Sequence, residues 1–144
     1  MGGHGGLHEV RIPVATDADI VQARQSGRAM AARAGCTTTD LTAVATAISE
    51  VARNIVNYAG EGEIEVCLVN RRDRLGVRIT ARDRGPGIAD IEQALEDGFT
   101  TGSGLGLGLP GARRLMDEFS ISSEPGKGTT VVMHKWSRSD SSRV

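Results

Sequence analysis

The sequence predicts an α+β domain in which a mixed, mostly antiparallel sheet carries its helices on one face. Three observations predict this fold: apolar and polar residues alternate in several short segments, other segments have a helical period, and the order is strand, two helices, hairpin, helices, hairpin. No repeat or linker divides the 144 residues. We therefore expect one domain over residues 7–136, with flexible termini at residues 1–6 and 137–144.

The first two elements are an edge strand and a helix. Apolar residues alternate with polar ones over residues 10–14, which predicts a strand. Pro13 lies within it and cannot donate a hydrogen bond to a neighbour, so we expect this strand at an edge of the sheet. A helical period follows over residues 17–34, and Gly35 is suited to end that helix.

A second helix and a hairpin come next. An apolar stripe from residue 41 to residue 59 predicts the helix, with Thr38 or Thr39 as its N-cap and Gly60 at its end. Strict alternation then predicts two strands joined by a polar turn. The strands and the turn are expected at residues 64–68, 75–81 and 70–73.

The second half of the chain is expected to hold short helices and a closing hairpin. A short helix is expected at residues 90–97, and residues 99–109 contain too much glycine for a stable element. Pro110 suits the first turn of a further helix that would turn Leu115, Met116 and Phe119 inward. The closing hairpin is expected to pair residues 119–123 with residues 129–136.

Composition excludes several classes of protein. The hydrophobic fraction of 39% and the charged fraction of 24% are typical of a globular chain. No stretch approaches the ~20 apolar residues of a membrane span, and no signal-peptide pattern is present. The net charge of −1 argues against a dedicated nucleic-acid binder, and Cys36 and Cys67 have no metal-site spacing. We expect a cytoplasmic protein without a membrane or nucleic-acid partner.

Glu50, Asn54 and Asn57 share one stripe of the second predicted helix because they lie at positions i, i+4 and i+7. A solvated helix face is the ordinary interpretation. The alternative is a carboxylate that abstracts a proton, one turn from an amide oxygen that could bind Mg²⁺. Helix spacing alone leaves both open.

Asp83-x-Gly85-x-Gly87 directly follows a predicted strand. Asp, Gly and Pro are common where a strand ends, so an ordinary turn is one interpretation. The other is a carboxylate that accepts a hydrogen bond from an exocyclic amine, beside glycines that let a flat ring lie against the backbone.

A glycine-rich segment precedes the helix at Pro110. Its glycines alternate with leucines, which predicts one side that packs and backbone N–H groups that face an anion such as phosphate. The residues concerned are Gly102, Gly104, Leu105, Gly106, Leu107 and Gly108. The dinucleotide fingerprint Gly106-x-Gly108-x-x-Gly111 is disfavoured because no buried strand leads into it.

Four segments in order resemble the GHKL or Bergerat ATP-binding fold. They are Glu50-x-x-x-Asn54, Asp83-x-Gly85-x-Gly87, Gly102-x-Gly104-Leu105-Gly106-Leu107-Gly108 and Gly126-x-Gly128-Thr129. Within that superfamily the chain resembles the small anti-sigma factor serine/threonine kinases, and in particular the stressosome switch kinases of the RsbT type. The runs that carry this likeness are residues 97–102, 106–111, 114–119 and 125–130.

The resemblance implies ATP and Mg²⁺ as cofactors and a role for each segment. Glu50 would be the general base, and Asn54 would ligate Mg²⁺. Asp83 would accept from the adenine amino group, with Thr129 nearby through water. Two sets of residues would surround the nucleotide: Gly85 and Gly87 at the adenine pocket, and Gly102, Gly104, Leu105, Gly106, Leu107 and Gly108 in a lid over the phosphates.

The resemblance also implies partners. It implies a partner-switching kinase that phosphorylates a STAS-domain antagonist or scaffold protein and also binds a PP2C-type phosphatase or a sigma factor. The alternatives are an anti-sigma factor that directly inhibits a sigma factor, and a nucleotide-dependent binding module with negligible turnover. A homodimer stays open. Arg53 is a candidate for contact with the γ-phosphate, although a surface charge is its ordinary interpretation.

Overall fold

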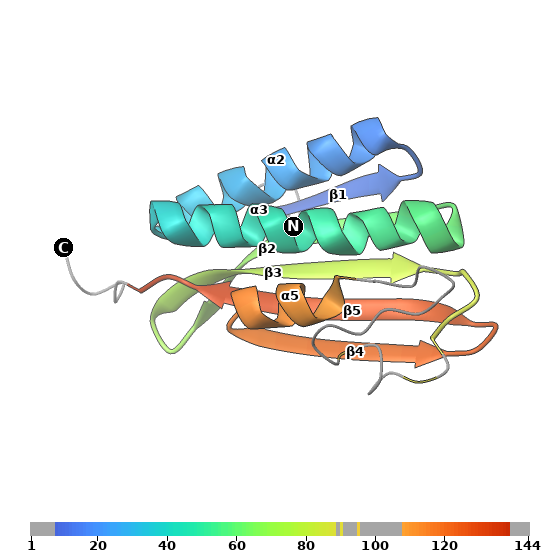
Figure 1. Cartoon of the computed structure of the whole chain (residues 1–144). Coiled ribbons are helices and arrows are strands. Elements are labelled where there is room, and N and C mark those ends of the chain that lie inside the picture. The colour runs from blue at the N-terminus through green and yellow to red at the C-terminus, as the bar shows by residue number, and fades with distance from the viewer. Residues whose placement is uncertain (1–7, 89, 91–94, 96–107, 139–144) are drawn as a thin grey trace, which may run out of the picture.

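The computed structural model describes residues 8–88, 90, 95 and 108–138. Five strands form one sheet in the order β1-β2-β3-β5-β4, and helices α2, α3 and α5 lie on the same side of it (Figure 1). The elements are β1 Glu9–Val14, α2 Asp17–Arg33, α3 Thr38–Asn54, the π-helix η1 Ile55–Ala59, β2 Gly62–Arg71, β3 Arg74–Asp83, α5 Leu109–Leu115, β4 Glu118–Glu124 and β5 Gly128–Trp136. The predicted α+β fold with helices on one face is confirmed.

All four pairings among the described strands are antiparallel. β1 lies at the edge of the sheet, as Pro13 predicts, and β2 is its one partner among the strands that the structure describes. β2 and β3 are joined by the two residues Arg72 and Asp73, both with positive φ (52° and 66°). The turn has two residues and not the expected four. A two-residue turn with positive φ matches the twist of the flanking strands, so the strands extend further toward it.

The helix N-termini are capped by threonine side chains. Thr16 accepts from the Asp19 N–H at 3.2 Å, while the Asp19 carboxylate accepts from the Thr16 N–H at 3.1 Å, which completes a capping box. Thr37 caps α3 by accepting from the Asp40 N–H at 3.2 Å. The expectation of Thr38 or Thr39 is wrong, because Thr37 has the extended backbone of an N-cap and both later threonines are already helical.

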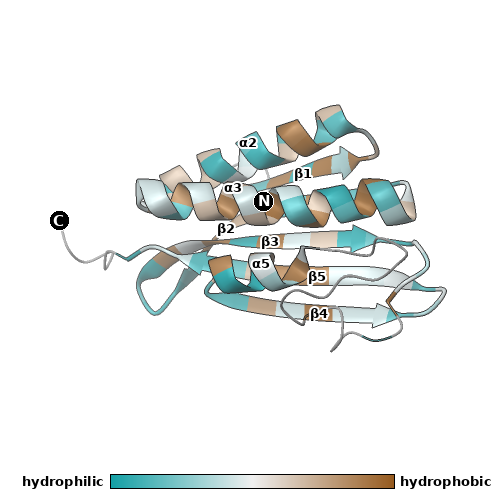
Figure 2. Cartoon of the chain, in the orientation of Figure 1, coloured by the Kyte–Doolittle hydropathy of each residue, from teal (hydrophilic) through white to brown (hydrophobic). Residues whose placement is uncertain are grey.

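The core lies between the helices and one face of the sheet. Hydrophobic and hydrophilic residues succeed each other in bands along α2 and α3 (Figure 2). Ile48 on α3 is fully buried, and a Cβ on Gly27 of α2 would overlap its Cδ1. The two helices therefore approach closely at this point because α2 has no side chain there. No helix in the described part of the chain is long and apolar enough to cross a membrane.

The helix after Pro110 is shorter than expected. α5 ends at Leu115, Met116 has extended backbone, and Phe119 lies on β4 rather than on the helix. The Asp117 N–H donates to the His134 carbonyl at 2.9 Å, so the chain already pairs with β5 where the helix was expected to continue. The helix expected at residues 90–97 lies outside the described residues except for residues 90 and 95, as do residues 99–107 of the glycine-rich segment.

A buried lysine holds the start of α3 and the end of α5 to β5. Lys135 and Asp40 are each 6% exposed, and Lys135 Nζ lies 3.6 Å from Asp40 and 3.4 Å from Asp117. Lys135 also donates to the Leu115 carbonyl at 2.7 Å. Ser137, one residue beyond the expected end of the domain, is 3% exposed, and its N–H donates to the Leu75 carbonyl at 2.8 Å.

Replacement of Lys135 by alanine is expected to destabilise the fold by about 3 kcal/mol, because it removes the buried cation beside Asp40 and leaves that carboxylate with the exposed Arg138, whose Nε lies 3.5 Å away. Urea unfolding followed by circular dichroism measures the loss. Lys127→Ala is the matched control, since the pair it makes with Glu124 is 76% and 70% exposed; its cost should stay within about 0.5 kcal/mol. Equal effects of the two variants would contradict the prediction.

Candidate functional site

Glu50 lies on the C-terminal half of α3, with its side chain one-third exposed. Arg53 Nη1 lies 3.3 Å from Glu50 Oε2. Gly108, the residue before α5, has φ +70°, and a Cβ there would overlap Glu50 Oε1. The structure therefore brings the predicted base against the last predicted residue of the glycine-rich segment. Gly102, Gly104, Leu105, Gly106 and Leu107 lie outside the described residues.

A π-helical turn follows Asn54 directly. α3 ends at Asn54, and η1 then runs to Ala59, where the Gly60 N–H donates to the Ile55 carbonyl at 2.8 Å. The sequence predicts a continuous α-helix here, which is wrong for this last turn. Glu50 and Asn54 remain one α-helical turn apart, whereas Asn57 lies in the π-turn and leaves the expected i+7 stripe. Such π-turns are rare and frequently occur at functional sites.

Asp83 is the last residue of β3 and pairs with Thr129 of β5 in the sheet register. Its Oδ1 accepts from the Gly85 N–H at 2.8 Å. Asp83 has the same parity along β3 as the buried residues Ile79 and Ala81, so it points to the helical face of the sheet. The predicted acceptors Asp83 and Thr129 are therefore neighbours on one face, at one end of the sheet.

Gly85 and Gly87 lie where other parts of the backbone approach closely. A Cβ on Gly85 would lie 2.6 Å from the Ala59 Cβ of the π-turn. Gly87 has φ +78°, and a Cβ there would overlap the Glu124 carbonyl at the end of β4. The Gly85–Gly87 segment thus runs between the π-turn and the β4–β5 hairpin, and only glycine fits at both positions.

Ser123 is a member of this cluster that sequence analysis missed. It pairs with Thr129 in the β4–β5 register, and its Oγ lies 2.8 Å from Thr129 Oγ1. The Ile88 N–H donates to Ser123 Oγ at 2.7 Å. The alternation along β4 could have pointed to Ser123, which shares the inward parity of Phe119 and Ile121. Its partner Thr129, however, is known only from the pairing register of β4 with β5.

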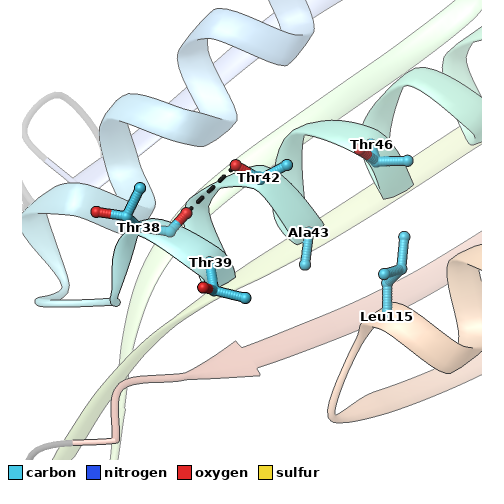
Figure 3. Close-up of a pocket in the computed structure, with 6 residues that line it drawn as sticks. All are labelled: Thr38, Thr39, Thr42, Ala43, Thr46 and Leu115. Carbon is cyan, nitrogen blue, oxygen red and sulfur yellow. Dashed lines mark hydrogen bonds between the residues drawn. The ribbon is translucent and has the colours of Figure 1, made fainter.

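An open groove lies along the other half of α3. Thr39, Ala43 and Thr46 line it, and they share the side of α3 that carries Glu50. Leu115 of α5 faces this side of the helix (Figure 3). The described residues that line the groove carry no charge, so they could make apolar contacts and hydroxyl hydrogen bonds but provide no acid or base.

The opposite face of the sheet holds a possible set of metal ligands. Glu9, Glu65 and Cys67 place one ligand atom each within 4.8 Å of one another. Arg11 Nε lies 3.0 Å from Glu9 and 3.2 Å from Glu65, and Arg78 donates to Cys67 Sγ at 3.7 Å. The neighbouring Glu9 carboxylate and burial raise the pKa of Glu65. Guanidinium groups already neutralise this cluster, so it gives no reason to place a metal there.

Comparison with known proteins agrees with this geometry. Residues 14–135 match the family described as the histidine kinase-like ATPase domain. The chain is 51% identical over 127 residues to the serine/threonine-protein kinase RsbT of Bacillus subtilis, which covers 88% of this chain and 96% of that protein. It is 35% identical over 119 residues to an anti-sigma F factor of Caldanaerobacter subterraneus, which covers 79% and 82% of the two chains.

Solved structures show the same fold. The RsbU and RsbW domains of a Mycobacterium tuberculosis protein superpose with a TM-score of 0.62 at 22% identity, over 91% of this chain and 33% of that one. The catalytic domain of the histidine kinase ThkA superposes with a TM-score of 0.51 at 15% identity, over 88% and 95%.

The chain therefore belongs to the histidine kinase-like ATPase, or GHKL, family. Its similarity to these relatives identifies it as an ATP-using protein serine/threonine kinase of the partner-switching type.

Replacement of Gly108 by alanine is expected to lower the free energy of unfolding by about 1–3 kcal/mol, because the left-handed backbone and the Glu50 side chain both oppose a Cβ. Gly111→Ala is the matched control, three residues further on, where a Cβ meets nothing within 4 Å. Gly111 lies within α5, so alanine there should leave stability unchanged or raise it by up to about 1 kcal/mol. Thermal unfolding of both variants measures the contrast, and loss of stability in Gly111→Ala alone would refute it.

Proposed function

We propose that this kinase transfers the γ-phosphoryl group of Mg²⁺-bound ATP to a serine or threonine hydroxyl of a STAS-domain antagonist or scaffold protein. The close approach of Glu50 to Gly108 supports the proposal most directly. It brings a carboxylate to the end of the segment expected to cover the phosphates. Asp83 and Thr129, at one end of the sheet, offer acceptors to an adenine ring.

Glu50 acts as the general base in this proposal. The substrate hydroxyl oxygen forms a bond to the γ-phosphorus, its proton passes to the Glu50 carboxylate, and the bond to the bridging β–γ oxygen breaks so that ADP leaves. Arg53 lies 3.3 Å from Glu50, and this ion pair restricts the orientation of the carboxylate. Phosphoryl transfer needs positioning and charge neutralisation more than covalent chemistry.

Asn54 holds the metal in this proposal. Its donor chemistry fits Mg²⁺, which takes hard oxygen ligands, keeps several waters and needs few protein ligands. Asn54 lies one α-helical turn from Glu50 and ends α3 at the π-turn, so the two residues share one face of α3. Bound Mg²⁺ would neutralise phosphate charge.

The base and phosphates of ATP would lie along the remaining residues. Asp83 accepts from the adenine amino group, and Thr129 does so through water. Gly85 and Gly87 bring the backbone close enough to form a flat pocket, since neither position tolerates a Cβ. The phosphates would meet the segment formed by Gly102, Gly104, Leu105, Gly106, Leu107 and Gly108.

The second partner is proposed from the relatives. Similarity to the switch kinase RsbT at 51% identity favours a PP2C-type phosphatase that the kinase activates. The alternative is an anti-sigma factor that binds a sigma factor directly, which the names of the relatives at 33–36% identity favour. Phosphorylation of the antagonist would release the kinase to the second partner in either case.

Glu50→Gln is expected to lower phosphotransfer to a purified STAS-domain partner by about 10²–10⁴-fold while ATP binding persists, because the amide cannot accept the proton. Labelled ATP with Mg²⁺ measures transfer, and calorimetry measures binding. Glu63→Gln is the matched control, an exposed glutamate on β2 paired with Arg82. Full transfer by Glu50→Gln would remove the residue from its role, and absence of ATP binding by the unaltered chain would refute the function itself.

Asn54→Ala is expected to weaken ATP binding in Mg²⁺ by at least about tenfold and to leave metal-free binding in EDTA nearly unchanged, because only the metal-bound nucleotide uses the amide oxygen. Calorimetry with and without Mg²⁺ separates the two effects. Asn70→Ala, an exposed asparagine near the β2–β3 turn, should match the unaltered chain in both buffers. An equal loss with and without metal would contradict metal ligation by Asn54.

A further inference from the structure

The Ser123 hydroxyl has three hydrogen-bond partners, and two of them determine which bonds it donates and which it accepts. The Ile88 N–H can only donate, and it reaches Ser123 Oγ at 2.7 Å. The Gly128 carbonyl can only accept, and it lies 3.0 Å from the same oxygen. Thr129 Oγ1, at 2.8 Å, could do either. A serine hydroxyl has one proton and two lone pairs.

The direction of the Ser123–Thr129 hydrogen bond follows from this count. Ser123 gives its one proton to the Gly128 carbonyl, so it has none left for Thr129. Thr129 must therefore donate its own proton to Ser123, whose second lone pair receives it. All three hydrogen bonds of Ser123 are then made, and the remaining lone pairs of Thr129 Oγ1 can only accept.

The neighbouring Asp83 carboxylate also accepts hydrogen bonds. Asp83, paired with Thr129 in the register, is acceptor-only when ionised, and one of its oxygens already accepts from the Gly85 N–H. This end of the sheet therefore offers acceptors from both side chains. The Gly85–Ile88 segment beside them is held to the hairpin by the Ile88 contact and by the Gly126 N–H, which donates to the Pro86 carbonyl at 2.7 Å.

We propose that Ser123 is a positioning residue for base selection. By accepting the hydrogen bond from Thr129, Ser123 leaves Thr129 Oγ1 as an acceptor. A water that donates one proton to Thr129 and the other to Asp83 can then only accept from the base, so this end of the sheet selects a 6-amino purine and rejects a 6-oxo purine. The proposal rests on the proposed function, since it requires the base to lie against Asp83 and Thr129. When Ser123 is absent, the Thr129 hydroxyl can donate to that water, which can then give a proton to a 6-oxo group, so discrimination falls.

Competitive binding of ATP and GTP to the full chain with Mg²⁺ tests the proposal. Ser123→Ala should lower the ratio of ATP to GTP affinity by about five- to tenfold, the effect of one hydrogen bond. Ser122→Ala is the matched control, because this exposed neighbour points to the other face of β4. Ser123→Thr should keep the ratio and Ser123→Val should lose it, since these two side chains share a shape and differ in the hydroxyl.

A double-variant cycle shows whether Ser123 acts through Thr129. Thr129→Val removes the hydroxyl that Ser123 directs, so Ser123→Ala added to it should change the ratio no further. Equal weakening of ATP and GTP by Ser123→Ala would overturn the proposal, because a merely structural role moves both affinities together. A full effect that persists in Thr129→Val would also overturn it. Absence of ATP binding by the unaltered chain would instead refute the proposed function, which keeps the two failures distinct.

Discussion

The site depends on one close approach, between the backbone at Gly108 and the Glu50 carboxylate. A β-carbon at Gly108 would overlap Glu50 Oε1, and the left-handed backbone there opposes any other residue. This contact couples the start of α5 to the last turns of α3. The proposed base, the proposed metal ligand and the segment expected to meet the phosphates thus come from two elements held against each other at one point.

The sheet supplies the other half of the site through its register. Asp83, Thr129 and Ser123 come from three strands, yet they lie in one row because β5 pairs with β3 on one side and with β4 on the other. Glycine again permits the approach, since Gly85 faces the π-turn and Gly87 faces the end of β4. We propose that the donors and acceptors of these three side chains decide which base they bind, because the Ser123 hydroxyl has only one proton to donate.

Family membership and geometry support different parts of the functional conclusion. The relatives establish a kinase of the GHKL family and the partner-switching context. The geometry bears on how individual residues would act: a base beside a cation, an amide oxygen at a helix end, and acceptors on one edge of a pocket. The open groove along α3 is lined by uncharged described residues on the side of the helix that carries Glu50.

The sequence by itself determined the order of elements, the edge position of β1 and the identity of most candidate site residues, because alternation, helical period and glycine spacing are local properties of the chain. It did not determine that α3 ends in a π-turn, that α5 ends before Phe119 or that Thr37 provides the cap. In each case the alternative local conformations differ little in free energy, and tertiary packing decides between them. Ser123 was missed because its partner Thr129 is set by the pairing register of β4 with β5. Only the tertiary structure decided which residues meet. Glu50 and Gly108, or Ser123 and Ile88, are distant in the chain and become neighbours through the sheet register and helix packing.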